Sequence, residues 1–296
     1  MDFADRLHQR IRDTGSRVCL GIDPRPDRSP LTDPEALGHD RQRVADAVAD
    51  VYEAILRDAH AYLACCKPQS AFFEALGLEG LVALSRVMAV ARELELPIIL
   101  DAKRGDIGST AEAYARAYLT DGALAADALT VNPYLGLDTL EPFLEAAEAG
   151  ERGVFVLVKT SNPGSSDLQD LHVDEGLMVH EVLAGRLAAR AQDLRSGERG
   201  YTALGAVVGA THREALAALR RRLPRSVLLV PGVGAQGAGP ADVIDAFDAD
   251  GLGAVVNASR SLFDGEAESV DALAGNAADR ARRLRDGING ALEQRA

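Results

Sequence analysis

Lysine is scarce in this chain. Of its 32 lysine and arginine residues, only Lys67, Lys103 and Lys159 are lysines. Each of the three ends a short apolar run of the kind that forms a β-strand. Arginine keeps its proton in proteins, whereas lysine can act as an acid, a base or an amine nucleophile. A general preference for arginine explains the composition but not this shared position, so we expect at least two of the lysines to take part in chemistry.

Cysteine is scarce as well, and its distribution excludes the common cysteine motifs. Cys19, Cys65 and Cys66 lie inside apolar runs, without a CxxC pair or a Cys/His cluster. Cysteines of this kind are usually buried free thiols, whereas a small secreted chain would use them in disulfides. We therefore expect a protein of a reducing compartment.

The chain also lacks a membrane-spanning run, a signal peptide and an excess of positive charge. No apolar run approaches the ~20 residues that cross a bilayer, and residues 1–10 are polar and amphipathic, unlike a signal peptide. The formal net charge is -13 and the pI is about 4.9, whereas nucleic-acid binders usually carry a positive patch. These absences predict a soluble cytoplasmic protein that binds neither membranes nor nucleic acids.

What the chain does have is a regular alternation of strand-like and helix-like segments. We expect strands at 17–23, 61–67, 96–103, 127–132, 153–159, 203–209, 226–232 and 253–259. We expect helices at about 41–59, 77–94, 108–122, 138–147, 174–195, 211–222, 240–247 and 270–292. Continuous runs of Val, Ile and Leu are typical of strands that are covered on both faces. Such strands, alternating with helices, predict an α/β protein with a (β/α)8 TIM barrel.

The predicted fold has one main alternative, a doubly wound open sheet. The first turn lacks the GxGxxG fingerprint of a dinucleotide fold, which disfavours it. Because we find no domain linker, we expect residues 1–296 to form a single domain, with 1–14 as an outer helix and 284–296 as the end of the closing helix. The connections 24–40 and 162–173 are long and rich in Pro, Gly, Ser and Asp, which makes them candidate lids.

The strongest local motif is Asp101-Ala-Lys103-Arg-Gly-Asp106. Residues two apart in a strand point to the same side, so Asp101 and Lys103 should project together at the carboxyl end of the third strand. Lys67 ends the neighbouring strand, and Asp106 follows in the next loop. Two carboxylates and two ammoniums would then hold one another ionised.

This motif has two other interpretations. A network of salt bridges could close the edge of the barrel without taking part in chemistry. Asp101 and Asp106 could also hold Mg²⁺, but the two adjacent ammoniums would oppose the ion. No histidine in these segments completes a transition-metal site, and we predict no metal.

A second motif follows the last two predicted strands. Residues 231–237 read Pro-Gly-Val-Gly-Ala-Gln-Gly, and residues 257–261 read Asn-Ala-Ser-Arg-Ser. Loops at these positions commonly bind phosphate in barrels. Glycines let backbone N–H groups approach an anion, while Arg260 can offer a two-pronged donor and Gln236 a neutral one. We therefore predict a phosphorylated substrate whose reacting centre lies beside Lys103.

Together these residues resemble the orotidine 5′-phosphate decarboxylase family, in its longer bacterial (type 2) subgroup. The resemblance covers most of the chain and keeps the same order throughout. It rests on residues 21–24, 66–69, 71–74, 101–110, 160–164, 231–237 and 259–261. It implies a carboxy-lyase of pyrimidine biosynthesis, which converts orotidine 5′-monophosphate (OMP) to uridine 5′-monophosphate (UMP) and CO₂ without a cofactor.

The resemblance implies roles for individual residues. Lys67, Asp101, Lys103 and Asp106 would form the catalytic charge array. In that array Lys103 would deliver a proton to C6 of the pyrimidine, and Asp101 would sit beside the departing carboxylate. Further residues would contact the substrate from the partner subunit of a homodimer, namely Asp106, Ile107 and Thr110. Contacts within the chain would come from Asp23 at a ribose hydroxyl, Ser161 at the pyrimidine, Pro231 in the pocket lining, and Gln236, Ser259 and Arg260 at the phosphate side.

Ser259 departs from the pattern, because many members have glycine before the arginine. Other functions also stay open at this point. A Schiff-base aldolase acting on a sugar phosphate could use Lys103 or Lys159. A sister barrel enzyme could handle a sugar phosphate with Mg²⁺, and a catalytically silent relative could bind nucleotides alone. Lys159 has no role in the resemblance, and we expect it to pair with a neighbouring carboxylate.

Overall fold

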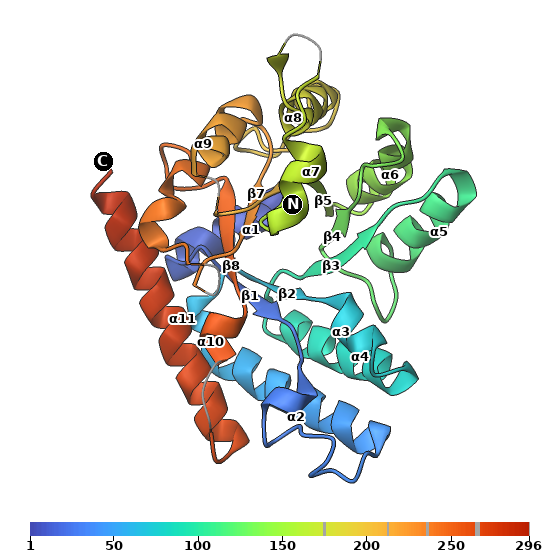
Figure 1. Cartoon of the computed structure of the whole chain (residues 1–296), viewed down its shortest axis with the longest axis vertical. Coiled ribbons are helices and arrows are strands. Elements are labelled where there is room, and N and C mark those ends of the chain that lie inside the picture. The colour runs from blue at the N-terminus through green and yellow to red at the C-terminus, as the bar shows by residue number, and fades with distance from the viewer. Residues whose placement is uncertain (174–175, 212, 235–236, 264–266, 296) are drawn as a thin grey trace.

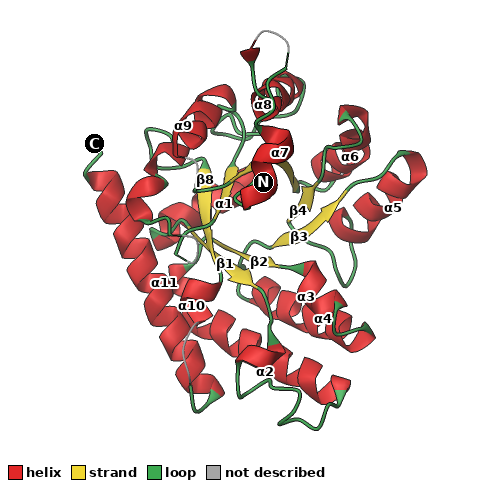
Figure 2. Ribbon diagram, viewed as in Figure 1, coloured by secondary structure: helices red, strands yellow, loops and turns green. Residues whose placement is uncertain are grey.

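The computed structural model describes residues 1–173, 176–211, 213–234, 237–263 and 267–295. Within them, eight parallel strands form one sheet that curves into a barrel, with helices around it (Figures 1 and 2). The strands are β1 (Val18–Ile22), β2 (Cys65–Pro68), β3 (Ile99–Arg104), β4 (Ala128–Val131), β5 (Gly153–Lys159), β6 (Leu204–Val208), β7 (Leu228–Pro231) and β8 (Ala254–Ala258).

The sheet closes into a nearly complete barrel. Its strand order is β2-β1-β8-β7-β6-β5-β4-β3, so β2 and β3 are the two edges that must meet. Parallel bridges join Cys66 to Ile98 and Gln69 to Asp101 across these edges, and Cys66 N donates to Pro97 O at 2.9 Å. The predicted (β/α)8 TIM barrel is therefore confirmed, and the open sheet is wrong.

Helices form the outer layer, as Figure 1 shows in a view down the barrel. In the described residues the α-helices are α1 (Phe3–Thr14), α2 (Arg41–Ala59), α3 (Ser70–Glu74), α4 (Leu78–Glu93), α5 (Gly108–Leu119), α6 (Glu141–Ala149), α7 (Ser166–Gln169), α8 (Val179–Arg190), α9 (Arg213–Arg222), α10 (Arg260–Phe263) and α11 (Val270–Glu293).

Helix α2 has the boundaries predicted for 41–59 because its signals are local. The carboxylate of Asp40 caps the first turn by accepting from Gln42 N at 2.9 Å and from Arg43 N at 3.3 Å. One face carries apolar residues every three or four positions and is buried.

The helix predicted at 174–195 is shorter in the structure. It is α8, Val179–Arg190, and residues 174–175 lie outside the described part of the chain. It begins late because Met178 keeps an extended backbone, and the Met178 N–H donates to the carboxylate of Glu181 at 3.0 Å.

The prediction of an α-helix at 240–247 is wrong. Two short 3₁₀ turns, Pro240–Asp242 and Ile244–Ala246, occupy this segment. Phe247 then returns to extended backbone, and its side chain is buried. The helical stretch therefore ends at Ala246 and does not form a continuous α-helix.

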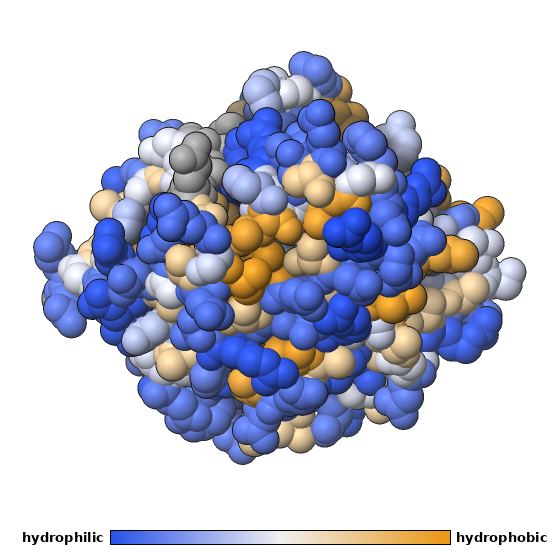
Figure 3. All heavy atoms as spheres, turned by 90° about the horizontal axis from the view of Figure 1, so that it is seen from below, coloured by the Kyte–Doolittle hydropathy of each residue, from blue (hydrophilic) through white to orange (hydrophobic). Residues whose placement is uncertain are grey.

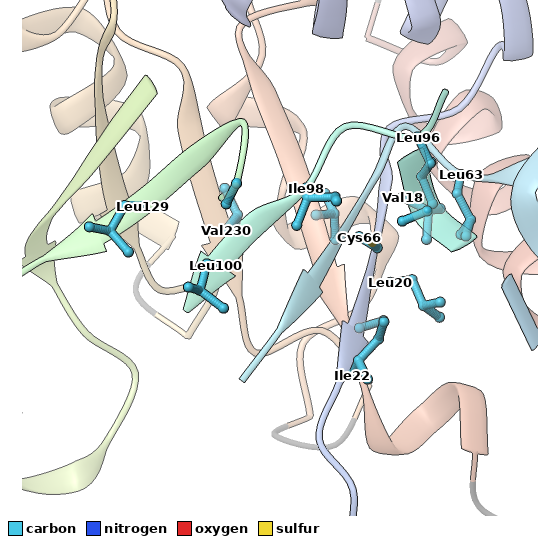
Figure 4. Close-up of a cluster of buried hydrophobic side chains, with 14 of the residues drawn as sticks. Val18, Leu20, Ile22, Leu63, Cys66, Leu96, Ile98, Leu100, Leu129 and Val230 are labelled. Atoms are coloured by element: carbon cyan, nitrogen blue, oxygen red, sulfur yellow. The ribbon is translucent and has the colours of Figure 1, made fainter. Parts of the chain in front are cut away.

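Strand side chains alternate between two buried layers, as expected for a sheet covered on both faces. In β1, Val18, Leu20 and Ile22 pack in the layer between strands and helices, part of which Figure 4 shows. Cys19 of β1 and Phe155 of β5 belong to a second layer inside the barrel.

The three cysteines are free and buried. Cys19 and Cys65 lie in the inner layer and Cys66 lies in the outer one. Burial raises the pKa of the Cys65 and Cys66 thiols. The prediction of buried free thiols is therefore confirmed.

Helix α1 is the helix predicted at 1–14, and it lies across the amino-terminal end of the barrel. Phe3, Leu7 and Ile11 are buried against residues of the inner layer. The ring of Phe3 meets the ring of Phe155 edge-on, with centroids 5.8 Å apart. The same ring packs over Gly153, where any Cβ would collide with it. The helix closes the barrel at the end opposite the loops that follow the strands.

The surface is mainly polar where Figure 3 displays it. Hydrophilic residues dominate that face, and hydrophobic ones gather in small patches near its centre and toward its right-hand side. No helix within the described ranges is both long enough and apolar enough to cross a membrane.

Candidate active site

A cavity of about 510 Å³ lies at the carboxyl ends of the strands. Barrels of this kind place their chemistry at this end, because the loops after the strands meet there. Of the predicted site residues, those that line the cavity are Asp23, Lys67, Asp101, Lys103, Ser161, Pro231, Ser259 and Arg260. The structure thus brings together residues from six different strands or the loops that follow them.

Asp101 stands between two lysines in this cavity. Lys67 Nζ lies 2.6 Å from Asp101 Oδ2, and Lys103 Nζ lies 2.5 Å from Asp101 Oδ1. The side chains of Lys67 and Asp101 are 5% and 10% exposed, whereas that of Lys103 is 45% exposed. Lys103 is therefore the cation of this group that a ligand in the cavity can reach most easily.

The charges of the buried pair are fixed by their neighbours. Burial alone would raise the pKa of the Asp101 carboxyl, but the ammoniums of Lys67 and Lys103 outweigh burial and lower this pKa. Burial would likewise lower the pKa of Lys67, but the carboxylates of Asp101 and Asp23 raise it. At neutral pH Asp101 is therefore a carboxylate and Lys67 an ammonium.

Two further residues hold Asp101, and sequence reasoning assigned neither of them to the site. Gln69 Nε2 donates to Asp101 Oδ2 at 3.0 Å, and Thr130 Oγ1 donates to Asp101 Oδ1 at 2.9 Å. Gln69 lies two residues after Lys67, so strand periodicity could have indicated it. Thr130 occupies the last inward position of the otherwise apolar β4, a weaker signal. In the described part of the chain, no group of three or more His, Cys, Asp or Glu side chains is arranged to hold a metal ion.

Asp23 follows β1 and lines the cavity. Its Oδ1 atom is buried and has no hydrogen-bond partner among the described residues. Buried polar atoms are nearly always hydrogen-bonded in folded proteins. This oxygen is therefore an acceptor that a ligand hydroxyl can satisfy.

The predicted phosphate side is formed by the ends of β7 and β8. Pro231, Ser259 and Arg260 line the cavity there. Gly234 has a φ of 82°, which suits glycine and shapes the turn after β7. Gln236 was predicted as a phosphate ligand, but it lies outside the described residues.

The serine that departs from the resemblance is accommodated by a neighbouring glycine. Gly21 of β1 faces Ser259, and a Cβ at residue 21 would collide with Ser259 Oγ. Glycine at position 21 of β1 therefore leaves the space that the Ser259 side chain after β8 occupies.

The loop after β5 places Ser161 at the cavity, and the buried Lys159 forms an ion pair where this loop begins. Gln169 of α7 accepts from Thr160 N and donates to Thr160 Oγ1, each at 2.9 Å. Lys159 is 2% exposed, and its Nζ lies 2.7 Å from Asp170 Oδ1. The expected pairing of Lys159 with a carboxylate is confirmed, and Lys159 does not line the cavity.

Comparison with known proteins gives the family. A profile of the Orotidine 5′-phosphate decarboxylase / HUMPS family matches residues 16–273. The chain belongs to this family. Orotidine 5′-phosphate decarboxylase of Deinococcus radiodurans is 45% identical over 290 residues, which are 98% of either chain. That of Rhodopirellula baltica is 47% identical over 271 residues, which are 88% of either chain.

A solved structure extends the likeness to three dimensions. The OMP decarboxylase of Leishmania donovani is 35% identical and superimposes with a TM-score of 0.78, which covers 99% of this chain and 100% of that one. Within the Orotidine 5′-phosphate decarboxylase / HUMPS family, the chain therefore stands with the orotidine 5′-phosphate decarboxylases, which are carboxy-lyases.

Three predicted site residues of this family member lie away from the cavity. Asp106 and Ile107 belong to the turn between β3 and α5, and Thr110 lies in the first turn of α5. In the described part of the chain, none of the three lines the cavity. Asp106 Oδ1 accepts from Ile107 N at 2.8 Å, and Ile107 is 62% exposed. A single chain thus assembles Lys67, Asp101 and Lys103 but not the fourth predicted charge.

The two candidate lids have different structures. The connection 24–40 contains one 3₁₀ turn, Pro26–Arg28, and lines a second cavity of about 300 Å³ that meets the first at Asp23, Ser259 and Arg260. The connection after Asn162 contains a 3₁₀ turn and the short helix α7. Whether either segment closes over a ligand stays a prediction.

Proposed function

We propose that this chain catalyses the decarboxylation of OMP to UMP and CO₂ in the cytoplasm, without a cofactor, as a step of pyrimidine biosynthesis. The observation that carries the proposal is the Lys67–Asp101–Lys103 group at the mouth of the barrel, in a chain of the Orotidine 5′-phosphate decarboxylase / HUMPS family. The cavity of about 510 Å³ falls within the range of typical small-molecule sites.

The chemistry explains why such a group is useful. Loss of CO₂ from C6 leaves a carbanion in the plane of the ring, which the π system cannot delocalise. Fixed charges that are already in place can stabilise the charge that develops in the transition state. Lys103 would place its ammonium beside C6 and supply the proton, and its 45% exposed side chain is accessible for this role.

Asp101 would meet the carboxylate of the substrate as a like charge. Its lowered pKa keeps it ionised at neutral pH, so the repulsion is present when OMP binds and is relieved as CO₂ departs. Lys67 is nearly buried and would act mainly by holding Asp101 in place through the 2.6 Å ion pair.

The remaining cavity residues supply contacts along the nucleotide. The buried oxygen of Asp23 that has no partner in the protein supports binding of a ribose hydroxyl. Arg260 can bind the phosphate with two parallel hydrogen bonds, and we retain Gln236 and Ser259 as its companions. Ser161 would contact the pyrimidine, and Pro231 would line the pocket.

We further propose a homodimer in which Asp106, Ile107 and Thr110 complete the active site of the partner subunit. Their position outside the cavity of their own chain supports this arrangement. Ile107, Tyr134 and Leu135 are 62%, 75% and 52% exposed. Large exposed apolar side chains often mark a protein–protein contact.

An absorbance assay with OMP, run with and without a chelator, tests the function. We expect decarboxylation that the chelator does not change and that Lys103→Ala abolishes. Activity that requires added Mg²⁺ would favour the sugar-phosphate enzyme, and a borohydride-trapped adduct at Lys103 would favour the aldolase. Binding of UMP with no change in OMP absorbance would identify a silent nucleotide binder.

Subunit mixing tests the shared site. Lys103→Ala and Asp106→Ala proteins should each be inactive, but a mixed dimer carries one intact site. After free exchange half of the dimers are mixed, so activity should return to about one quarter of the parent value in a two-fold symmetric dimer. Two inactive variants whose mixture stays inactive, although exchange is verified by mass, would disprove the cross-subunit arrangement.

A further inference from the structure

The hydroxyl of Thr130 makes three hydrogen bonds inside the charged group. It donates to Asp101 Oδ1 at 2.9 Å and accepts from Ala102 N and Lys103 N, each at 3.0 Å. A threonine hydroxyl has one donor and two acceptor positions, so all of them are used. Thr130 itself is 1% exposed, which keeps water from replacing these bonds.

The backbone of β3 is irregular at the same place. The pairing of β3 with β4 is regular at Ile99 and Leu100, and it then shifts so that Arg104 stands opposite Val131. Between these points Lys103 has a φ of 47°, in the left-handed region that non-glycine residues rarely adopt. In this bulge, the N–H groups of Ala102 and Lys103 donate to the Thr130 side chain.

We infer that Thr130 is a positioning residue, whose hydroxyl sets the backbone of Lys103 and the carboxylate of Asp101 so that the Lys103 ammonium meets the reacting carbon. The inference rests on the proposed decarboxylation. It adds a residue that lines the cavity and that would act through its two neighbours, Asp101 and Lys103, and not on the reacting atoms.

The geometry explains why one hydroxyl has this effect. Asp101 Oδ1 receives both the Thr130 hydroxyl and, at 2.5 Å, the Lys103 ammonium. The hydroxyl therefore fixes Lys103 at both ends, through its backbone N–H and through the oxygen that binds its ammonium. Removing it leaves two N–H groups without their acceptor and the left-handed residue without its support, and such strained conformations persist only where the surroundings hold them.

The test is a matched pair of variants, Thr130→Val and Thr130→Ser. Valine keeps the shape without the hydroxyl, and serine keeps the hydroxyl. For Thr130→Val we expect kcat to fall roughly 100-fold, as a misplacement of about 1 Å can cause. KM and the affinity for UMP should change less than about threefold, because the predicted phosphate contacts follow β7 and β8, which β5 and β6 separate from β4. For Thr130→Ser we expect kcat within about threefold of the parent, which a loss of packing alone would not predict.

Two controls separate this inference from the proposed function. If the parent chain does not decarboxylate OMP, the proposed function is wrong; if the parent is active and Thr130→Val matches it, the positioning role is wrong. Crystal structures of both variants test the geometry without an assay. A Thr130→Val structure with Lys103 still left-handed and still bonded to Asp101 Oδ1 would overturn the inference. Should Thr130→Val not fold, Thr130→Ala removes the same hydroxyl and carries the same expectations.

Discussion

Asp101 accepts hydrogen bonds from four side chains, and two of the donors are ammoniums. Among Lys67, Asp101 and Lys103, one carboxylate thus faces two cations in a partly buried cavity, and the carboxylate of Asp23 also acts on Lys67. Such an arrangement suits the binding of an anionic substrate better than it suits the stability of the empty protein, because buried charges lose their hydration.

Substitutions of Asp101 and of Lys103 should therefore have different effects on stability. Asp101→Asn leaves Lys67 buried without its nearest counter-charge, and we expect the free energy of unfolding to fall by about 3 kcal/mol or more. Lys103→Met removes a cation that is 45% exposed, so the change should stay within about 1 kcal/mol. Urea unfolding of both variants at neutral pH measures the difference. An Asp101→Asn protein as stable as Lys103→Met would contradict this account.

For single residues, the sequence predicts which side chains lie together when they share a strand or end neighbouring strands. Lys67, Asp101 and Lys103 could be placed together because strand periodicity and strand adjacency determine their positions. Thr130 could not, because a single threonine in an apolar strand acquires its role only through the local shift in strand pairing. Asp106 shows another limit, since its proposed site lies in a second copy of the chain.

Helix α4 packs against α3 through a glycine, and this contact determines how closely the two elements approach. A Cβ on Gly80 of α4 would collide with the backbone carbonyl of Phe73 in α3. Since α3 follows β2, the strand that carries Lys67, a shift of α3 would be transmitted to the active site.

Two glycine-to-alanine variants should therefore have opposite effects. Gly80→Ala forces the helices apart, and we expect it to lower the free energy of unfolding by about 1–3 kcal/mol. Gly185→Ala lies within α8, where a Cβ meets no atom within 4 Å, and it should raise that free energy by about 0.5–1 kcal/mol because alanine favours helix. Thermal and urea unfolding report both changes. Equal effects in the two variants would show that the α3–α4 contact can relax.

The elements that sequence predicted well are those with local signals. The cap at Asp40 and the buried face of α2 fixed its limits at the predicted residues. The segment 240–247 was predicted as a helix from its apolar pattern, but it forms two short 3₁₀ turns and ends at the buried Phe247. The difference between a 3₁₀ turn and an α-helix in so short a segment is not encoded in its apolar pattern.

The whole barrel is sealed at its amino-terminal end, and one histidine is enclosed there. His8 of α1 is fully buried, with its ring 4.6 Å from that of Tyr201 and its Nε2 accepting from Gly253 N at 3.3 Å. Burial lowers the pKa of His8 to about 4. The folded protein therefore holds this histidine neutral.

This burial should make the fold sensitive to mild acid. The unfolded chain protonates His8 near its ordinary pKa of about 6.5, whereas the folded chain does so only near 4. The contribution of His8 to the free energy of unfolding is thus complete above about pH 6.5 and is lost as the pH falls toward 4. The loss amounts to at most about 3 kcal/mol.

Urea unfolding of the parent and of His8→Gln at several pH values between 4 and 7 measures this contribution. The decrease in unfolding free energy on acidification should be smaller in His8→Gln, because glutamine at position 8 does not titrate. The exposed His39 provides a control, since His39→Gln should leave the decrease unchanged. A parent and a His8→Gln protein with the same pH dependence would contradict the assignment.

The complete burial of Cys19, Cys65 and Cys66 has a practical consequence. None of these sulfurs should react with a maleimide dye while the protein stays folded, so no native cysteine has to be replaced before labelling. A cysteine introduced at Glu35, an exposed position in the connection 24–40, would then carry a single fluorophore. Its emission could follow this segment in real time as nucleotide is added.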